Sequence, residues 1–124
     1  MTPAARSLYV FGIYLLGLGA VIVTAPDALL ALLRLPPATD PWLRVLGVLV
    51  VVIGLLDVTS ARAEQTAFFR ATVWIRFVVL ISFIGLVLVQ LAPPVLIVFG
   101  VIDAAGAVWT KLSLARSTVG PGAA

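Results

Sequence analysis

Apolar residues fill four long runs of this chain, and short segments rich in proline or polar residues separate the runs. Each run approaches the roughly 20 residues that a helix needs to cross the hydrocarbon core of a bilayer. We expect transmembrane helices at about residues 7–25, 41–61, 67–91 and 94–113. The pattern therefore predicts an all-α membrane protein, a four-transmembrane-helix bundle in a single domain covering residues 1–124.

The first run is open to a second interpretation. It follows a single basic residue and ends in Val23-Thr24-Ala25, which fits the small-residue cleavage site of a signal peptide. However, Pro26 would follow the cut, and the run is longer than most signal cores. We therefore favour a retained helix, in which Gly12 and Gly19 lie on one stripe where another helix can approach closely.

A short apolar segment at residues 26–35 lies between the first two runs. Pro26 suits the first turn of a helix, Asp27 suits its positive end, and Pro36-Pro37 ends the segment. At about ten residues the segment is too short to span a bilayer. We expect a short interfacial helix between helices 1 and 2.

The boundaries of the second run and of the chain's end have their own signals. Thr39 or Asp40 can cap the second helix, Pro41 fits its first position, and Trp42 suits the membrane interface. Residues 116–124 are expected to form a flexible tail.

Composition agrees with a membrane environment and narrows the chemistry. The 124 residues are 63% hydrophobic and 10% charged, whereas soluble domains carry about 25% charged residues. The chain has no cysteine and no histidine, which excludes disulfides, thiolate chemistry and the usual zinc, copper and haem ligands. We expect no metal and no cofactor. The net charge of +3 is too small and too scattered to indicate nucleic-acid binding.

The distribution of basic residues predicts the orientation. With four spans, one side of the membrane carries five basic residues and the other carries two. By the positive-inside rule, the side with five is cytoplasmic. We expect a multi-pass protein of the bacterial inner membrane with both termini inside. The five are Arg6, Arg62, Arg70, Lys111 and Arg116, and the two are Arg34 and Arg44.

The most informative residue is Asp103, an acid in the middle of the fourth run. A carboxylate at this depth costs at least ~2.5–3.5 kcal/mol on insertion scales unless it is paired, hydrated or protonated. Arg76 in the third run lies at a similar depth, about nine residues or ~13 Å from the same side. We therefore expect Arg76 to meet Asp103 directly or through water.

Four further polar residues are candidates for this site. Asp57 lies one turn inside the end of the second helix, and Arg44 lies on a face of that helix that Asp57 borders. Gln90 is spaced to lie on the Arg76 face, and Thr110 lies on the small, polar stripe of Asp103. Two acids and one guanidinium leave one negative charge, so another arginine compensates it or one carboxyl is held protonated. Asp103 and Asp57 are the candidates for a catalytic proton carrier.

Several motifs resemble those of a group of small, uncharacterised four-helix bacterial membrane proteins. They are Pro26-Asp27, Leu35-Pro36-Pro37, the segment from Pro41 to Gly47, and Asp103 with Trp109-Thr110. The overall layout is loosely similar to the DoxX-like group. The resemblance implies a four-helix membrane fold and brings no established activity.

Three functions remain open, and whether the protein is an enzyme is undecided. The first is a membrane protein that binds a lipid, an isoprenoid-like molecule or a partner helix at the Arg76–Asp103 site. The second is a membrane enzyme that uses acid–base chemistry on a lipophilic substrate. The third is a small dimeric transporter coupled to protons. Each places the chain in a lipid bilayer, with a lipophilic small molecule, a second copy or another membrane protein as partner.

Overall fold

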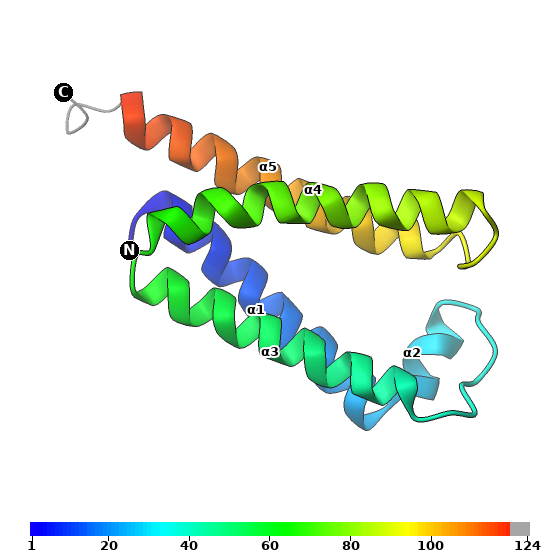
Figure 1. Ribbon diagram of the computed structural model, residues 1–124. Coiled ribbons are helices and arrows are strands. Elements are labelled where there is room, and N and C mark those ends of the chain that lie inside the picture. The colour runs from blue at the N-terminus through cyan, green and yellow to red at the C-terminus, as the bar shows by residue number, and fades with distance from the viewer. Residues whose placement is uncertain (120–124) are drawn as a thin grey trace. The chain divides into compact units, whose positions relative to one another are not determined.

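The computed structural model describes the backbone of residues 1–119 and the side chains of residues 1–116. In this part of the chain the protein is all-α. Its helices are α1 (Pro3–Thr24), α2 (Pro26–Leu32), α3 (Trp42–Arg62), α4 (Thr66–Leu88) and α5 (Leu96–Val119) (Figure 1).

Four of the helices are long and apolar enough to cross a membrane: α1, α3, α4 and the part of α5 at Leu96–Arg116. Many large apolar side chains on them are exposed, among them Ile53, Ile75 and Ile81. Exposed apolar surface on this scale is expected where lipid, rather than water, is the solvent. The predicted all-α, four-span architecture is confirmed.

Four helix ends differ from the predicted bounds by three residues or more, and one of them is the end of α4, at Leu88 and not at residue 91. α1 begins at Pro3, one turn before the predicted residue 7, because Thr2 caps it: the Thr2 hydroxyl oxygen accepts a hydrogen bond from the N–H of Ala5 at 3.2 Å. α2 has seven residues and ends at Leu32. α5 continues to Val119, so residues 116–119 of the predicted tail are helical, and the rest of that tail lies outside the described residues.

The start of α3 follows the predicted signal. The carboxylate of Asp40 accepts a hydrogen bond from the N–H of Trp42 at 3.1 Å, which satisfies one of the donors that a helix start leaves without a partner. Pro41 precedes the first helical residue, and its carbonyl accepts from Val45.

Three helices end in the same way. Beyond α2, α3 and α4, the residues Arg34, Glu64 and Gln90 each have a positive φ, between 53° and 61°. In each case the next residue donates to a carbonyl five positions back, and the positive-φ residue donates to one three positions back. This is the Schellman motif, whose left-handed position glycine usually fills. Here larger residues fill it, so the sequence carries no glycine signal for these helix ends.

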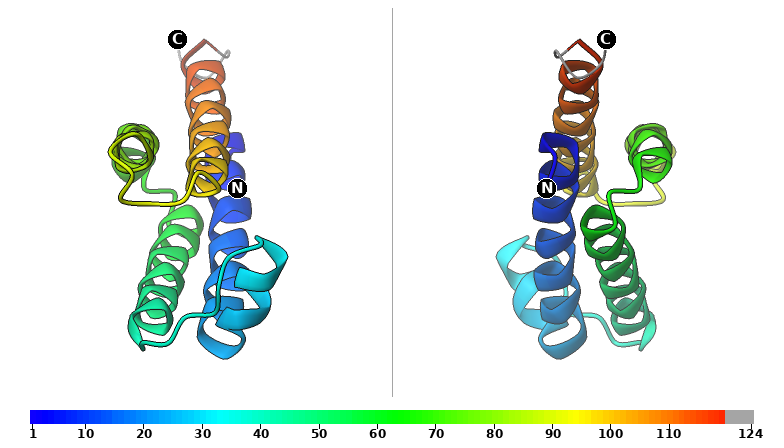
Figure 2. Two further views of the ribbon diagram at one scale, coloured as in Figure 1. Left: turned by 90° about the vertical axis from the view of Figure 1, so that its right-hand side faces the viewer. Right: turned by 90° about the vertical axis from the view of Figure 1, so that its left-hand side faces the viewer.

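The chain divides into two compact units, one made of Tyr9–Thr59 and the other of Met1–Leu8 with Ser60–Ala124. The Tyr9–Thr59 unit holds most of α1 and α3, which lie side by side and antiparallel (Figure 2). Two glycine pairs set their separation: a Cβ on Gly54 would lie 3.0 Å from the carbonyl oxygen of Gly12, and a Cβ on Gly19 would lie 2.8 Å from that of Gly47. The predicted close approach along the Gly12–Gly19 stripe is confirmed.

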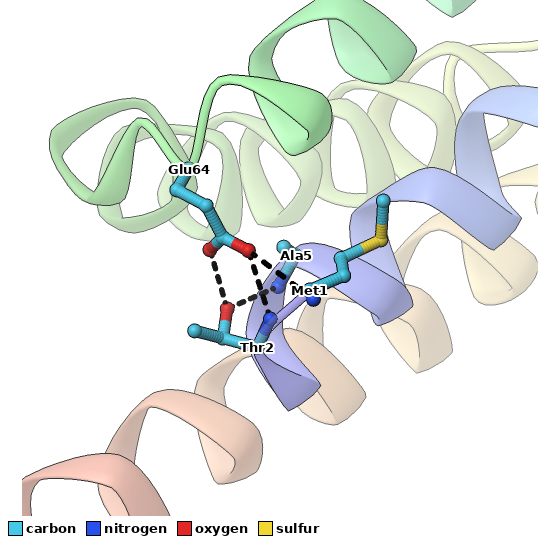
Figure 3. A network of polar contacts seen from close by, with 4 residues as sticks. All are labelled: Met1, Thr2, Ala5 and Glu64. Carbon is cyan, nitrogen blue, oxygen red and sulfur yellow. Dashed lines mark hydrogen bonds and ion pairs between the residues drawn. The ribbon is translucent and has the colours of Figure 1, made fainter.

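The second unit contains α4, α5 and the first turns of α1. α4 and α5 run antiparallel, and a Cβ on Gly100 would lie 3.0–3.3 Å from Leu80 and Phe83. Glu64, after the end of α3, binds the start of α1 (Figure 3). Its two carboxylate oxygens accept from the N–H of Thr2 at 2.8 Å and from the hydroxyl of Thr2 at 2.7 Å. The amino group of Met1 lies 4.0 Å from the same carboxylate.

Candidate functional site: a buried polar cluster on α4 and α5

Arg76 lies on the membrane-spanning helix α4, and its side chain is buried. α4 places Arg76 on its inner face with Phe69, Thr72 and Val73, and the side chain is 4% exposed. Nη2 donates a hydrogen bond to Oγ1 of Thr110 on α5 at 3.0 Å, and Nε donates a longer one, 3.4 Å, to the carbonyl oxygen of Thr72. Because Nη2 and Nε are both hydrogen-bonded, the orientation of the guanidinium group is fixed.

Thr110 connects Arg76 to the start of α1. Its Oγ1 lies 2.8 Å from Oγ of Ser7, and both side chains are fully buried or nearly so. Ser7 can also donate to the carbonyl oxygen of Ala4 at 2.7 Å, and Thr110 to that of Gly106 at 3.1 Å. These contacts form a polar chain that runs from Arg76 through two hydroxyl groups to a backbone carbonyl.

The hydroxyl groups of Ser7 and Thr110 cannot donate to all of their acceptors at once. Each hydroxyl donates one hydrogen bond, whereas Ala4, Gly106 and the Ser7–Thr110 contact together require three. Two arrangements keep the central contact bonded: Thr110 donates to Ser7 and Ser7 to Ala4, or Ser7 donates to Thr110 and Thr110 to Gly106. Thr110 retains a lone pair for Arg76 in both, so the proton order can reverse without releasing the guanidinium.

Asp103 lies on the same stripe of α5 as Thr110, two helical turns away, and is half-buried. Its carboxyl group interacts electrostatically with Arg76. Among the described residues, however, Asp103 forms no hydrogen bond and no ion pair within 4.0 Å. Arg76 and Asp103 therefore belong to one cluster, in which Thr110 accepts a hydrogen bond from Nη2 of Arg76.

Asp57 belongs to the Tyr9–Thr59 unit. It is 2% exposed on α3, and its Cβ lies 3.1 Å from where a Cβ on Gly12 of α1 would stand. The small size of Gly12 thus lets the carboxyl-bearing side of α3 pack against α1. Asp57 also has an interaction partner, so it is not a free acid.

Arg44, also in the Tyr9–Thr59 unit, serves the end of α1. Its Nη1 donates a short hydrogen bond to the carbonyl oxygen of Val23, in the last turn of that helix. A cation at this position stabilises the negative end of the helix and satisfies a carbonyl that has no partner within the helix.

Gln90 does not continue the Arg76 face, because α4 ends at Leu88. Gln90 stands in the left-handed conformation after that end and is exposed. The expectation that placed it beside Arg76 rested on a helix continuing to residue 91, which the Schellman motif at Val89 and Gln90 interrupts.

The polar cluster also contains Ser7, which the sequence analysis did not assign to a site. Ser7 is 1% exposed, and its Oγ lies 2.8 Å from Oγ1 of Thr110. Ser7 was missed because the first helix was expected to begin there. The Thr2-Pro3 pair, a capping residue followed by proline at the first helical position, is the signal that moves Ser7 inside α1.

The cluster offers a fixed cation, two reversible hydroxyl donors and a half-buried carboxyl group. Such a set can bind a polar group of a lipophilic molecule, and the carboxyl can exchange a proton. Among the described residues, no group of three or more acidic, cysteine or histidine side chains is arranged to hold a metal ion.

No family model matches the chain, and neither a curated protein nor a solved structure is significantly similar to it.

Proposed function

We propose that this small multi-pass membrane protein binds a lipophilic molecule through Asp103, with Arg76 as the neighbouring fixed cation. The observation that supports the proposal is the contrast between the two groups. Arg76 is held by hydrogen bonds to Thr110 and Thr72, whereas the carboxyl of Asp103 makes none among the described residues. Charged groups within membrane spans are costly, and they commonly line binding sites or ion pathways.

The chemistry of the cluster favours a ligand with a hydroxyl or another hydrogen-bond donor at one end. A carboxylate accepts such a bond, and a charge-assisted bond is stronger than a neutral one. The rest of the ligand would be apolar, as in a lipid or an isoprenoid-like molecule, because Val101 and Ile102, which precede Asp103 on α5, are exposed and apolar.

The test is native mass spectrometry of the protein purified from its membrane. We expect a co-purified lipophilic molecule whose bound fraction falls about 10-fold or more in Asp103→Ala, because a hydrogen bond to a charged group contributes ~1.5–3 kcal/mol. Ser82→Ala is the matched control, since among the described residues the Ser82 hydroxyl bonds only the carbonyl of Val78 on its own helix. Equal occupancy in wild type and Asp103→Ala, with unchanged thermal unfolding, would contradict the proposal.

The same carboxyl group supports a second candidate, acid–base chemistry on a lipophilic substrate. A mid-span acid without a hydrogen-bonded partner can accept and return a proton. In this case Asp103→Asn, which keeps the shape and removes the proton exchange, should leave a lipophilic precursor unconverted in cells. Unchanged lipid profiles in cells that carry Asp103→Asn would rule against it.

The expected location is a bacterial inner membrane with both termini in the cytoplasm, supported by five basic residues on one side and two on the other. The absence of cysteine from the chain makes a labelling test direct. In intact cells, a membrane-impermeant thiol reagent should label Thr39→Cys and leave Ala63→Cys unlabelled. The reverse result would invert the orientation.

A further inference from the structure

A second feature lies between α4 and α5 and does not include Arg76, Thr110 or Asp103. It is a shallow, open pocket lined by Arg70, Val73, Trp74, Lys111 and Leu114. All five residues lie in the same compact unit. The proposed ligand site at Asp103 does not use any of them.

Two cations and one aromatic ring are among the five residues that line this pocket. Nζ of Lys111 lies 5.7 Å from the centre of the Trp74 ring, within the range of a cation–π contact. Arg70 precedes Trp74 by four residues, so both project from the same face of α4. Among the described residues neither Arg70 nor Lys111 forms an ion pair, and the pocket lining contains no acid. The pocket therefore carries an uncompensated positive charge.

The position of these residues along their helices places the pocket near a membrane boundary. Arg70 is in the second turn of α4, and Lys111 is near the end of the apolar span Leu96–Arg116. Trp74 is 69% exposed, which is common for tryptophan in the headgroup region of a bilayer. Basic pockets between transmembrane helices at this level recognise anionic lipid headgroups.

We propose that the Arg70–Trp74–Lys111 pocket binds the phosphate of an anionic glycerophospholipid. The planar guanidinium of Arg70 suits two phosphate oxygens, and the ammonium of Lys111 adds a second, compact charge. Val73, which is buried, and Leu114, which is half-buried, line the pocket with apolar groups that the start of an acyl chain can contact. A zwitterionic lipid would add a choline cation to a pocket that is already positive, so the pocket selects against it.

The test uses the full chain with Trp42→Phe and Trp109→Phe, which leaves Trp74 as the sole source of tryptophan fluorescence. The protein is reconstituted into vesicles of phosphatidylcholine and phosphatidylglycerol in a fixed ratio. In one sample the phosphatidylglycerol carries bromine, a fluorescence quencher, and in the other an equal amount of the phosphatidylcholine carries it. We expect brominated phosphatidylglycerol to quench Trp74 more strongly, with a binding preference of about fivefold or more for each cation engaged.

Three variants separate this pocket from general surface charge. Arg70→Gln combined with Lys111→Gln should abolish the preference, whereas Lys111→Arg, which keeps the charge, should retain it. Arg116→Gln is the matched control, because it removes an exposed basic residue from the same helix without touching the pocket. The proposal is overturned if wild type shows equal quenching by both lipids, or if Arg116→Gln lowers the preference as much as the double variant does.

A last arm distinguishes a lipid headgroup from free phosphate. Millimolar inorganic phosphate, added to the vesicles at constant ionic strength, should leave the bromolipid preference unchanged. Loss of the preference on this addition would assign the pocket to free phosphate and overturn the lipid assignment.

Discussion

Nη2 of Arg76 donates a hydrogen bond to Oγ1 of Thr110 across the α4–α5 interface, at 3.0 Å and with both groups buried. The bond joins the middle of one membrane-spanning helix to the inner face of the next. A hydroxyl group is a neutral partner, and a hydrogen bond from a charged donor to it contributes ~1.5–3 kcal/mol. Thr110 is therefore a structural support for the polar cluster as well as a member of it.

Thr110→Val should destabilise the protein by about 1–3 kcal/mol, because valine keeps the shape of threonine and removes the acceptor of a buried charged donor. Unfolding by denaturing detergent, followed by circular dichroism, measures the change. Thr24→Val is the control: the Thr24 hydroxyl is exposed and, within the part of the chain that the structure describes, bonds only the carbonyl oxygen of Ala20 on its own helix. We expect it to cost under about 0.5 kcal/mol.

Ser7→Ala adds a second check on the same chain of contacts. Ser7 and Thr110 touch at 2.8 Å, so their substitutions should not be additive. We expect Ser7→Ala to cost less in the Thr110→Val background than in wild type. Strict additivity would show that the two hydroxyls do not act together.

The sequence predicts the depth of the polar residues better than it predicts their partners. Counting residues from the helix ends puts Arg76 and Asp103 at one level, and the structure keeps both in one electrostatic cluster. The sequence does not tell in which direction around the helix axis each of these side chains points. The long side chain of Arg76 also reaches Thr110 on α5, and the sequence does not specify the side-chain orientations that decide which residue it bonds.

The sequence also predicts the start of a helix better than its C-terminal end. Asp40 predicts the start of α3 because only a few residue types cap the N-terminus of a helix. The ends of α2, α3 and α4 carry no such signal, because arginine, glutamate and glutamine occupy positions that usually hold glycine. As a result Gln90 was expected on the face of a helix that ends two residues before it.

Gly19→Ala should destabilise the α1–α3 packing. A Cβ at this position would lie 2.6 Å from Cγ2 of Val51 and 2.8 Å from backbone atoms of Gly47 and Val51, so the two helices must move apart. We expect a loss of about 1–3 kcal/mol, typical of overpacking. Gly17→Ala is the matched control, since its Cβ would meet nothing within 4 Å. It should be neutral or stabilising by up to about 1 kcal/mol. Equal effects of the two changes in a detergent unfolding assay would contradict the proposed close contact.

Substitutions of Gln90 should follow the cost of the left-handed conformation. Its φ of 61° is easy for glycine, tolerable for asparagine and unfavourable for a β-branched residue. We expect Gln90→Val to destabilise the protein by about 1–2 kcal/mol relative to Gln90→Asn, while Gln90→Gly should be no less stable than wild type. If Gln90→Val and Gln90→Asn unfolded at the same denaturant concentration, the positive φ would not be a feature of the folded protein.

The contacts of Glu64 predict a pH dependence at the start of α1. Hydrogen bonds from the Thr2 side chain and then from the Thr2 backbone lower the pKa of Glu64 below its ordinary value of 4.5, and partial desolvation opposes them weakly. A carboxyl whose folded pKa is depressed contributes stability above the unfolded value and loses it as the pH falls through the folded value. The stabilisation by Glu64 should therefore be complete well above pH 4.5 and be lost progressively as the pH falls below it.

Thermal unfolding in detergent between about pH 6 and pH 3 tests this, with Glu64→Gln as the variant that cannot titrate. Wild type should be more stable than Glu64→Gln at the upper end, and the difference should shrink toward the lower end. Thr2→Val removes the hydroxyl that lowers the pKa most, so in this variant the Glu64-dependent change should shift toward pH 4.5 and become smaller. A difference between wild type and Glu64→Gln that stayed constant across the range would show that the charge of Glu64 does not stabilise the start of α1.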